Sequence, residues 1–163
     1  MRAFDGNRLV IAWGASLLAI PMLSIFGRSL QRWVSESAGG LLAWGIGVST
    51  VALMLLGLAW LWRHQGGKAL WHLLWAAPLF AWYPLTLPMV EERIHFIVFG
   101  VFGFLSLRVF GLARGLTIAV AASGLDEALQ WSLPDRVGDW RDVGMNLLAS
   151  TGGAAFAVVA GKR

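Results

Sequence analysis

The sequence has no cysteine and few charged residues, and each shortage excludes or disfavours a class of protein. Without cysteine the chain has no disulfide, no thiolate nucleophile and no cysteine-based zinc or iron–sulfur site. Charged residues make up 13% of the 163 residues and hydrophobic residues 58%, against about a quarter and about half in soluble domains. This composition excludes a disordered chain and favours a membrane protein over a water-soluble one.

A patch of basic residues is also absent. The 13 Lys and Arg residues exceed the nine Asp and Glu residues by four, but they are dispersed between apolar runs. Nucleic-acid binding requires basic residues that are gathered on one surface. We therefore exclude nucleic acid as a partner.

Long apolar runs bounded by charge are plentiful. A hydrocarbon core about 30 Å thick needs about 20 mostly apolar residues in each spanning helix. Six runs approach this length, at residues 9–26, 41–62, 69–90, 94–109, 115–133 and 143–160. We predict an all-α fold, a polytopic transmembrane helical bundle of about six spanning helices that contacts membrane lipids.

The third of these runs is irregular because Pro78, Pro84 and Pro88 interrupt it. Proline removes a helical hydrogen bond and kinks or ends a helix. We therefore expect a Pro-broken third helix, with non-helical backbone over residues 84–90. Lipid cannot satisfy exposed peptide groups, so this backbone is expected at the rim of a cavity, and a re-entrant course is the alternative.

The placement of Lys and Arg predicts the orientation. With six spans, eight basic residues fall on the side of the two termini and five on the other side. Positive residues favour the cytoplasmic side, so we expect both termini to be cytoplasmic. Most acidic residues then lie outside, which places the chemistry at the outer face: Glu36, Glu91, Glu92, Asp135, Asp139 and Asp142.

Four polar residues in the fifth run share one helix face, because they are spaced three and four apart: Ser123, Asp126, Glu127 and Gln130. The two carboxyl groups start roughly 10 Å below the outer end of the run. Ionisable groups at such depth cost a few kcal/mol unless they face the bundle interior or water. We expect this stripe to point inward, toward the outer ends of the fourth and sixth runs, which carry Glu91, His95, Asp142 and Asn146.

Two interpretations of this polar group are open. One is a functional site, and the other is a set of hydrogen bonds and ion pairs that only hold helices together. Interhelical hydrogen bonds contribute about 0.6 kcal/mol each on average in membranes, so cohesion alone hardly needs so many ionisable groups. The number of these groups favours a functional site.

The spacing within this region resembles the signature of the VanZ-like family of bacterial membrane proteins. Two residues separate Glu127 from Gln130, five separate Gln130 from Arg136, five more precede Asp142, and three precede Asn146. Upstream, Glu91 followed by His95, Phe96 and Phe99 is similar to the acid-Lys-x-x-His-Phe motif of that family, although Glu92 stands where the family usually has Lys.

The resemblance implies a multi-pass protein of the bacterial cytoplasmic membrane, in a family linked to resistance against glycopeptide antibiotics such as teicoplanin. It covers residues 84–153. We therefore expect two parts, an N-terminal transmembrane hairpin of two spans over residues 1–68 and a VanZ-like domain over residues 69–163.

The residue types favour an acid–base site at the outer leaflet. Asp126 or Glu127 is the expected general acid or base, with His95 as the proton partner. Arginine binds phosphate or carboxylate through two parallel hydrogen bonds, which suits a lipid-linked or cell-wall intermediate. The residues expected to bind substrate are Glu91, Gln130, Arg136, Asp139, Arg141, Asp142 and Asn146. No recognised ligand motif is present, so we predict neither a metal nor a cofactor.

Two other function classes remain open. A non-catalytic protein would bind or transport a lipid or an antibiotic through the same cluster. A structural subunit would use its tryptophans and small residues as contact surfaces in a larger membrane complex. The sequence predicts no oligomeric state and leaves enzymatic activity undecided.

Overall fold

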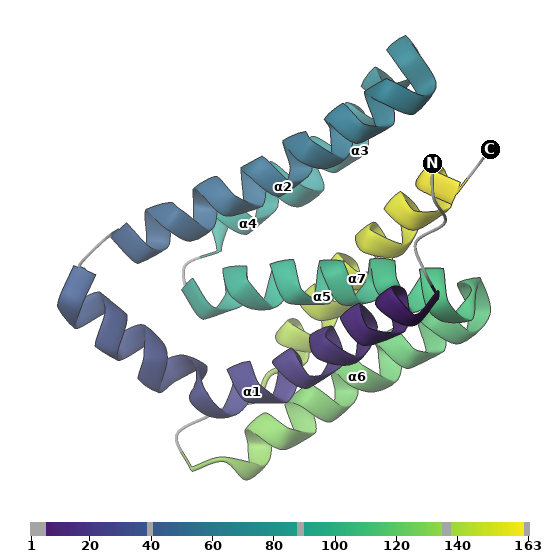
Figure 1. The fold of residues 1–163 in the computed structure, drawn as a ribbon. Coiled ribbons are helices and arrows are strands. Elements are labelled where there is room, and N and C mark those ends of the chain that lie inside the picture. The colour runs from purple at the N-terminus through teal and green to yellow at the C-terminus, as the bar shows by residue number, and fades with distance from the viewer. Residues whose placement is uncertain (1–5, 39–40, 88–89, 135–137, 162–163) are drawn as a thin grey trace. The chain divides into compact units, whose positions relative to one another are not determined.

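The computed structural model describes residues 6–38, 41–87, 90–134 and 138–161, and these ranges are helical apart from short connections (Figure 1). No β-strand occurs in them, which confirms the all-α prediction. The helices are α1 (Gly6–Ala38), α2 (Leu41–Gln65), η1 (Gly66–His72), α3 (Leu73–Ala77), η2 (Pro78–Trp82), α4 (Tyr83–Thr86), α5 (Val90–Phe110), α6 (Leu112–Ser132) and α7 (Trp140–Gly161).

Membrane-spanning helices are confirmed, but the predicted count of about six is not. Within the described ranges, four helical stretches are long and apolar enough to cross a bilayer: Gly6–Trp33, Trp44–Thr86, Glu92–Phe110 and Trp140–Gly161. The second stretch runs through two of the six predicted runs. α6 is not among the four, because its polar residues lower its mean hydropathy.

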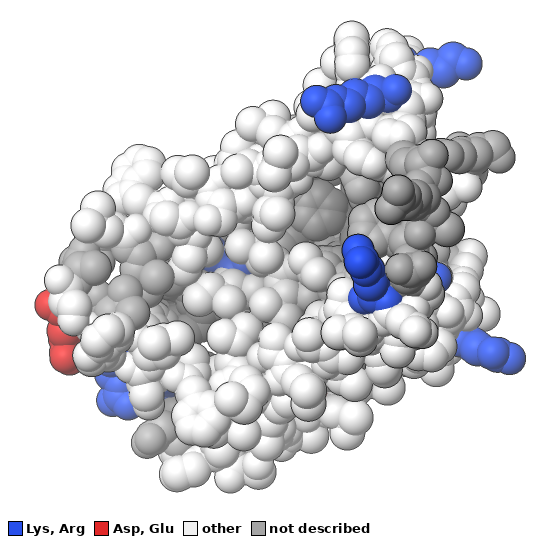
Figure 2. Space-filling model, in the orientation of Figure 1, with Lys and Arg blue, Asp and Glu red and all other residues white. Residues whose placement is uncertain are grey.

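Much of the surface is suited to lipid. Figure 2 shows a face on which most of the surface is uncharged and only a few Lys, Arg, Asp and Glu side chains appear. Large apolar side chains on α1 and α2 are exposed, among them Ile11, Leu18, Leu56 and Trp44. Apolar side chains exposed in this number are expected where the solvent is hydrocarbon.

The chain forms two compact units, residues 1–28 with 95–163 and residues 29–94. In the second unit, α2 and the segment from η1 to α4 lie side by side as a hairpin (Figure 1). The reversal begins at Gly66, whose φ of 59° suits glycine.

The proline-rich segment differs from its prediction. Pro78 starts a turn of π-helix, which ends where the Tyr83 N–H donates to the Pro78 carbonyl. Helix continues through Pro84 to Thr86, so the expected non-helical backbone over residues 84–86 is wrong. Pro84 is tolerated because it lies in the first turn of α4, where a backbone N–H is not needed. Leu87 is extended, as expected, and residues 88 and 89 lie outside the described residues. Val90 is already the first residue of α5, so the expectation is wrong there too.

The other unit contains the first part of α1, most of α5, and α6 and α7. Two close contacts join α5 to α7: a Cβ on Gly153 would overlap the Gly100 carbonyl oxygen, and one on Gly103 would overlap the Ser150 carbonyl oxygen. Small residues therefore let these helices approach backbone to backbone. The Trp13 indole of α1 packs edge-on against Phe110, with ring centroids 4.9 Å apart, and donates to the Ser106 hydroxyl at 3.0 Å.

Candidate functional site

The polar stripe of α6 points inward, as the spacing predicts. Ser123, Asp126, Glu127 and Gln130 are each at most 4% exposed. Their apolar neighbour Leu125 is 70% exposed, so one face of α6 is polar and buried while the other is apolar and exposed. This arrangement reverses that of a helix on a soluble protein, and it is expected for a helix surrounded by lipid.

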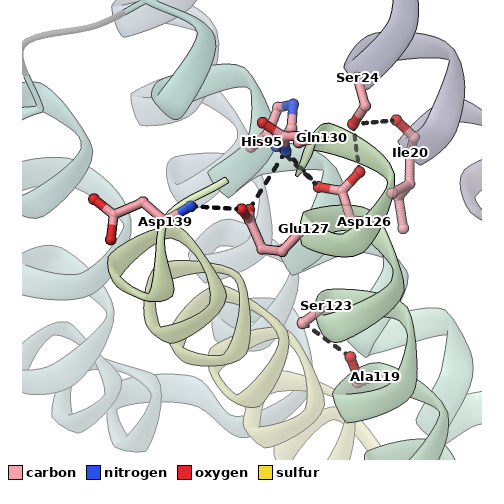
Figure 3. Close-up of polar contacts among 9 residues, drawn as sticks. All are labelled: Ile20, Ser24, His95, Ala119, Ser123, Asp126, Glu127, Gln130 and Asp139. Atoms are coloured by element: carbon pink, nitrogen blue, oxygen red, sulfur yellow. Dashed lines mark hydrogen bonds and ion pairs between the residues drawn. The ribbon is translucent and has the colours of Figure 1, made fainter. Parts of the chain in front are cut away.

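Asp126 is the centre of the site, because groups from three helices converge on its carboxylate (Figure 3). The His95 imidazole Nδ1 on α5 lies 3.5 Å from Oδ2. The Gln130 side-chain amide, one turn along α6, donates to the same oxygen at 3.1 Å. The hydroxyl of Ser24 on α1 donates to Oδ1. All of these residues belong to the unit of residues 1–28 and 95–163.

Glu127 connects the stripe to the start of α7. Its Oε2 accepts the backbone N–H of Asp139 at 3.0 Å, and its Oε1 accepts the Gln130 amide at 3.4 Å. Gln130 therefore bridges the two neighbouring carboxyl groups. The side chain of Asp139 points away from the cluster in Figure 3 and accepts the Arg141 backbone N–H at 2.9 Å. Asp139 thus acts as the N-terminal cap of α7.

Asn146 is fully buried on α7, and within the described part of the chain neither its side-chain nitrogen nor its side-chain oxygen has a hydrogen-bond partner. The packing of α7 against α5 shows which residue of α5 lies at the same height as Asn146 along the helix axes. The Ser150 hydroxyl donates to the Phe99 carbonyl, and Phe104 packs against Phe156, so residues of α7 lie level with residues of α5 about 51 lower in number. Asn146 therefore lies at the level of His95. A buried amide without partners is costly, which marks this position as one where a further hydrogen-bonding group is expected.

The remaining residues predicted for the site lie at its edge or outside the description. Asp142 is half-buried in the first turn of α7, within electrostatic range of His95 and Asp126. Arg141 is exposed. Arg136 falls outside the described residues, and so does the side chain of Glu91, although its backbone belongs to α5.

Ser24 was not among the residues predicted for the site. Ser123, the hydroxyl-bearing residue of the predicted stripe, donates to the Ala119 carbonyl of its own helix, at 2.9 Å, and not to a carboxylate (Figure 3). Ser24 is 0% exposed and lies 102 residues from Asp126 in the sequence. The available signal was a hydroxyl inside an apolar run, four residues after Ile20 on the same buried face.

Among the described residues, no group of three or more His, Asp or Glu side chains is arranged to hold a metal ion. His95 and the two carboxyl groups of α6 are instead joined to one another, to hydroxyl and amide groups, and to backbone. The arrangement suits hydrogen bonding and proton transfer between His95 and Asp126.

The comparisons with known proteins bear on the whole of this unit. A family model described as VanZ/LLP1 matches residues 15–161. The match is longer than the 84–153 segment on which the sequence resemblance rests, and it includes Ser24 in α1 as well as the polar residues of α5, α6 and α7. No curated protein and no solved structure matches the chain.

Proposed function

The chain belongs to the VanZ/LLP1 family, whose model matches residues 15–161, and from this premise we propose that it carries an acid–base site at the outer leaflet of the bacterial cytoplasmic membrane. The site acts on, or binds, a polar group of a lipid-linked or cell-wall intermediate. Resistance to glycopeptides such as teicoplanin is the expected readout of this activity.

The buried pair of His95 and Asp126 is the observation that carries the proposal. An imidazole and a carboxyl group 3.5 Å apart, both shielded from solvent, can pass a proton between them and to a bound group. Gln130 and Ser24 orient the carboxylate, so the pair is held before any ligand arrives. Asn146, level with His95 and without a hydrogen-bond partner among the described residues, offers an amide donor and an amide acceptor to the ligand.

The proposed orientation is supported by the two ends of this unit. Trp13 near the start of α1 packs on Phe110 at the end of α5, and the end of α7 lies near Arg108. The start of α1 and the end of α7 therefore lie at the end of this unit that is opposite His95 and Asp126. With both termini cytoplasmic, α6 crosses from inside to outside and the cluster faces the outer leaflet.

Topology can be tested by single cysteines, because the natural chain has none. In intact cells, an impermeant thiol reagent should label Ser132→Cys, an exposed position at the outer end of α6, and should not label Gly67→Cys. Labelling of Gly67→Cys but not Ser132→Cys would overturn the orientation. Permeabilised cells, in which both positions should react, provide the control.

The activity is tested by expressing the chain in a glycopeptide-susceptible bacterium and measuring teicoplanin susceptibility and the pool of lipid-linked cell-wall precursors. Asp126→Asn and Glu127→Gln keep the shape of the side chains and remove their carboxyl protons, so both variants should abolish any change that the wild type produces. Ser123→Ala is the matched control, since Ser123 is buried on the same stripe but bonds only its own helix. Full activity of Asp126→Asn would contradict the acid–base proposal.

Helix cohesion without a functional site is the second candidate role of the polar cluster, and one observation favours it. The described partners of Asp126 and Glu127 join α1, α5, α6 and the start of α7, which is the arrangement that helix cohesion requires. In that case Asp126→Asn should lose function only in proportion to its loss of thermal stability in detergent. A variant that unfolds like the wild type but is inactive rejects cohesion as the role.

A further inference from the structure

A groove with a volume of about 590 Å³ lies in the unit of residues 29–94. One face of α2 forms its floor, with lining residues at helical spacing from Trp44 to Leu55. Leu85 and Arg93 border it from α4 and α5. The volume falls within the range of about 300 to 1,000 Å³ that is typical of sites for small organic ligands.

The groove is apolar and follows the axis of α2. Gly47 brings α2 close to α4 at one end, where a Cβ would come within 3.0 Å of the Leu85 side chain. From there the floor continues along Val48, Val51, Ala52 and Leu55. The nine residues from Gly47 to Leu55 extend about 12 Å along the helix axis, which is eight steps of about 1.5 Å. Such a floor offers no hydrogen bonds to an extended peptide, whose amide groups would be left unpaired, but it suits a hydrocarbon chain.

Arg93 places a positive charge at the Gly47 end of this groove. Its Nε and Nη2 donate to the Leu87 carbonyl at 3.1 and 2.8 Å, and Nη2 also approaches the Leu85 carbonyl at 3.4 Å. No carboxylate pairs with Arg93 within the described part of the chain, and its Nη1 makes no hydrogen bond there. The guanidinium group is thus held in place by backbone carbonyls, and no carboxylate of the described side chains forms an ion pair with it. Its free edge suits a phosphate oxygen.

We propose that this groove binds an anionic phospholipid, with the phosphate at Arg93 and one acyl chain along α2 from Gly47 toward Leu55. The arrangement matches a lipid in its own leaflet, because Trp44 lies at the head-group end, where tryptophan is favoured at membrane interfaces. The proposal goes beyond the acid–base function, since the groove lies wholly in the unit of residues 29–94 and needs none of the residues of the Asp126 cluster.

The test is lipid binding to the purified full chain in detergent, measured by native mass spectrometry and by thermal shift. The probes are dioleoyl phosphatidylglycerol, dioleoyl phosphatidylcholine and inorganic phosphate. We expect phosphatidylglycerol to bind about tenfold more tightly than phosphatidylcholine, because both carry the phosphate but the choline ammonium of the second repels the guanidinium group. Inorganic phosphate should produce no shift, because it leaves the apolar floor uncovered.

Two pairs of variants separate the head group from the chain. Arg93→Gln should abolish the preference for phosphatidylglycerol, whereas Arg32→Gln, at an exposed arginine that does not line the groove, should retain it. Ala52→Trp fills the groove and should weaken both lipids, whereas Ala59→Trp, on the same face of α2 two turns beyond, should not. If Arg93→Gln fails to fold, Arg93→Lys keeps the charge without the planar fork and should reduce the preference.

Three results would overturn the proposal. Equal binding of both lipids by the wild type would remove the role of Arg93. An equal shift with inorganic phosphate would identify a site for the free anion instead of a lipid. Dimers that dissociate in Ala52→Trp but not in Ala59→Trp would identify the groove as an interface between two copies. None of these results depends on the activity of the Asp126 cluster, so the two proposals fail independently.

Discussion

The two units of the chain bury polar groups in opposite ways. In the unit of residues 1–28 and 95–163, the Asp126 carboxylate is enclosed, and side chains from α1, α5 and α6 supply its partners. In the unit of residues 29–94, Arg93 is half-buried beside an open groove, and backbone carbonyls at the end of α4 supply its partners. The first group is satisfied by the fold, whereas the second has no carboxylate partner among the described side chains and lies beside an apolar groove.

Small residues show the same contrast. Gly153 and Gly103 close the seam between α5 and α7 against backbone atoms, which cannot move without displacing a helix. Gly47 faces only the flexible end of the Leu85 side chain and leaves an open groove beside it. Glycine therefore allows close helix packing in one unit, and in the other it lies beside an open groove. The enclosed unit is suited to precise positioning of proton-transfer groups, and the open unit to an adaptable ligand such as an acyl chain.

The largest expected effect is that of Gly153→Ala. The added methyl group would overlap the Gly100 carbonyl oxygen, so α5 and α7 must separate, which should destabilise the protein by about 3 kcal/mol. Gly144→Ala on the same helix meets no atom within 4 Å and serves as the control. Gly47→Ala should be neutral or stabilising, because alanine is the better helix former and Leu85 can turn aside. Equal unfolding temperatures for Gly153→Ala and Gly47→Ala in detergent would contradict the claim that only Gly153 is required for close helix packing.

Removal of the central carboxylate should have the next largest effect. Asp126→Ala leaves Ser24, Gln130 and His95 without their shared partner and should destabilise the fold by about 2 kcal/mol. A double-mutant cycle with Ser24→Ala measures the interaction free energy between Ser24 on α1 and Asp126 on α6. We expect a coupling of about 1 kcal/mol, from thermal unfolding of the two single variants and the double variant. Additive effects would mean that α1 does not contribute to the enclosed cluster.

Much of this cluster could be predicted from local periodicity. Partners that are distant in the sequence could not be predicted. Polar residues three and four apart in an apolar run have to face inward in a membrane, so the stripe from Ser123 to Gln130 was visible in the sequence. The meeting of His95 with Asp126 followed from two charged helix ends on one side of the bilayer. Ser24 was not visible, because a serine in a membrane helix often bonds its own backbone, and nothing local shows that a carboxylate lies beside it.

Other differences between prediction and structure also have physical causes. Asp139 caps α7, a role that aspartate at a helix start commonly has, and its contact with substrate stays a prediction. Pro84 was expected to end a helix, but proline is tolerated in a first helical turn. The groove beside Arg93 could not be predicted, since it depends on how α4 lies against α2. The expected boundary at residue 68 stays a prediction.

Asn146→Leu should separate stability from function. Leucine has nearly the same shape as asparagine, and it removes two buried polar atoms that have no partner, so the unfolding free energy should rise by about 1 kcal/mol. If Asn146 serves a bound ligand, the more stable variant should lose its effect on cell-wall precursors and on glycopeptide susceptibility. A stabilised variant with full activity would show that Asn146 is not used. Asn146→Ala is not equivalent, because it would also create a cavity.

The smallest expected effect is that of Asp139→Ala, and it tests where the enclosed cluster ends. Glu127 accepts the backbone N–H of residue 139, which alanine retains, so the Asp126 cluster should stay intact. Only the cap on α7 is lost, which should lower the unfolding free energy by about 0.5 kcal/mol, and Asp139→Asn should restore it. Thermal unfolding in detergent and precursor analysis in cells are the measurements. If Asp139→Ala and Asp139→Asn both remove activity without a change in stability, the carboxylate itself contacts substrate. The site would then extend past the buried stripe to the exposed start of α7. It would be partly open to solvent, and the difference between the enclosed cluster and the open groove would be smaller.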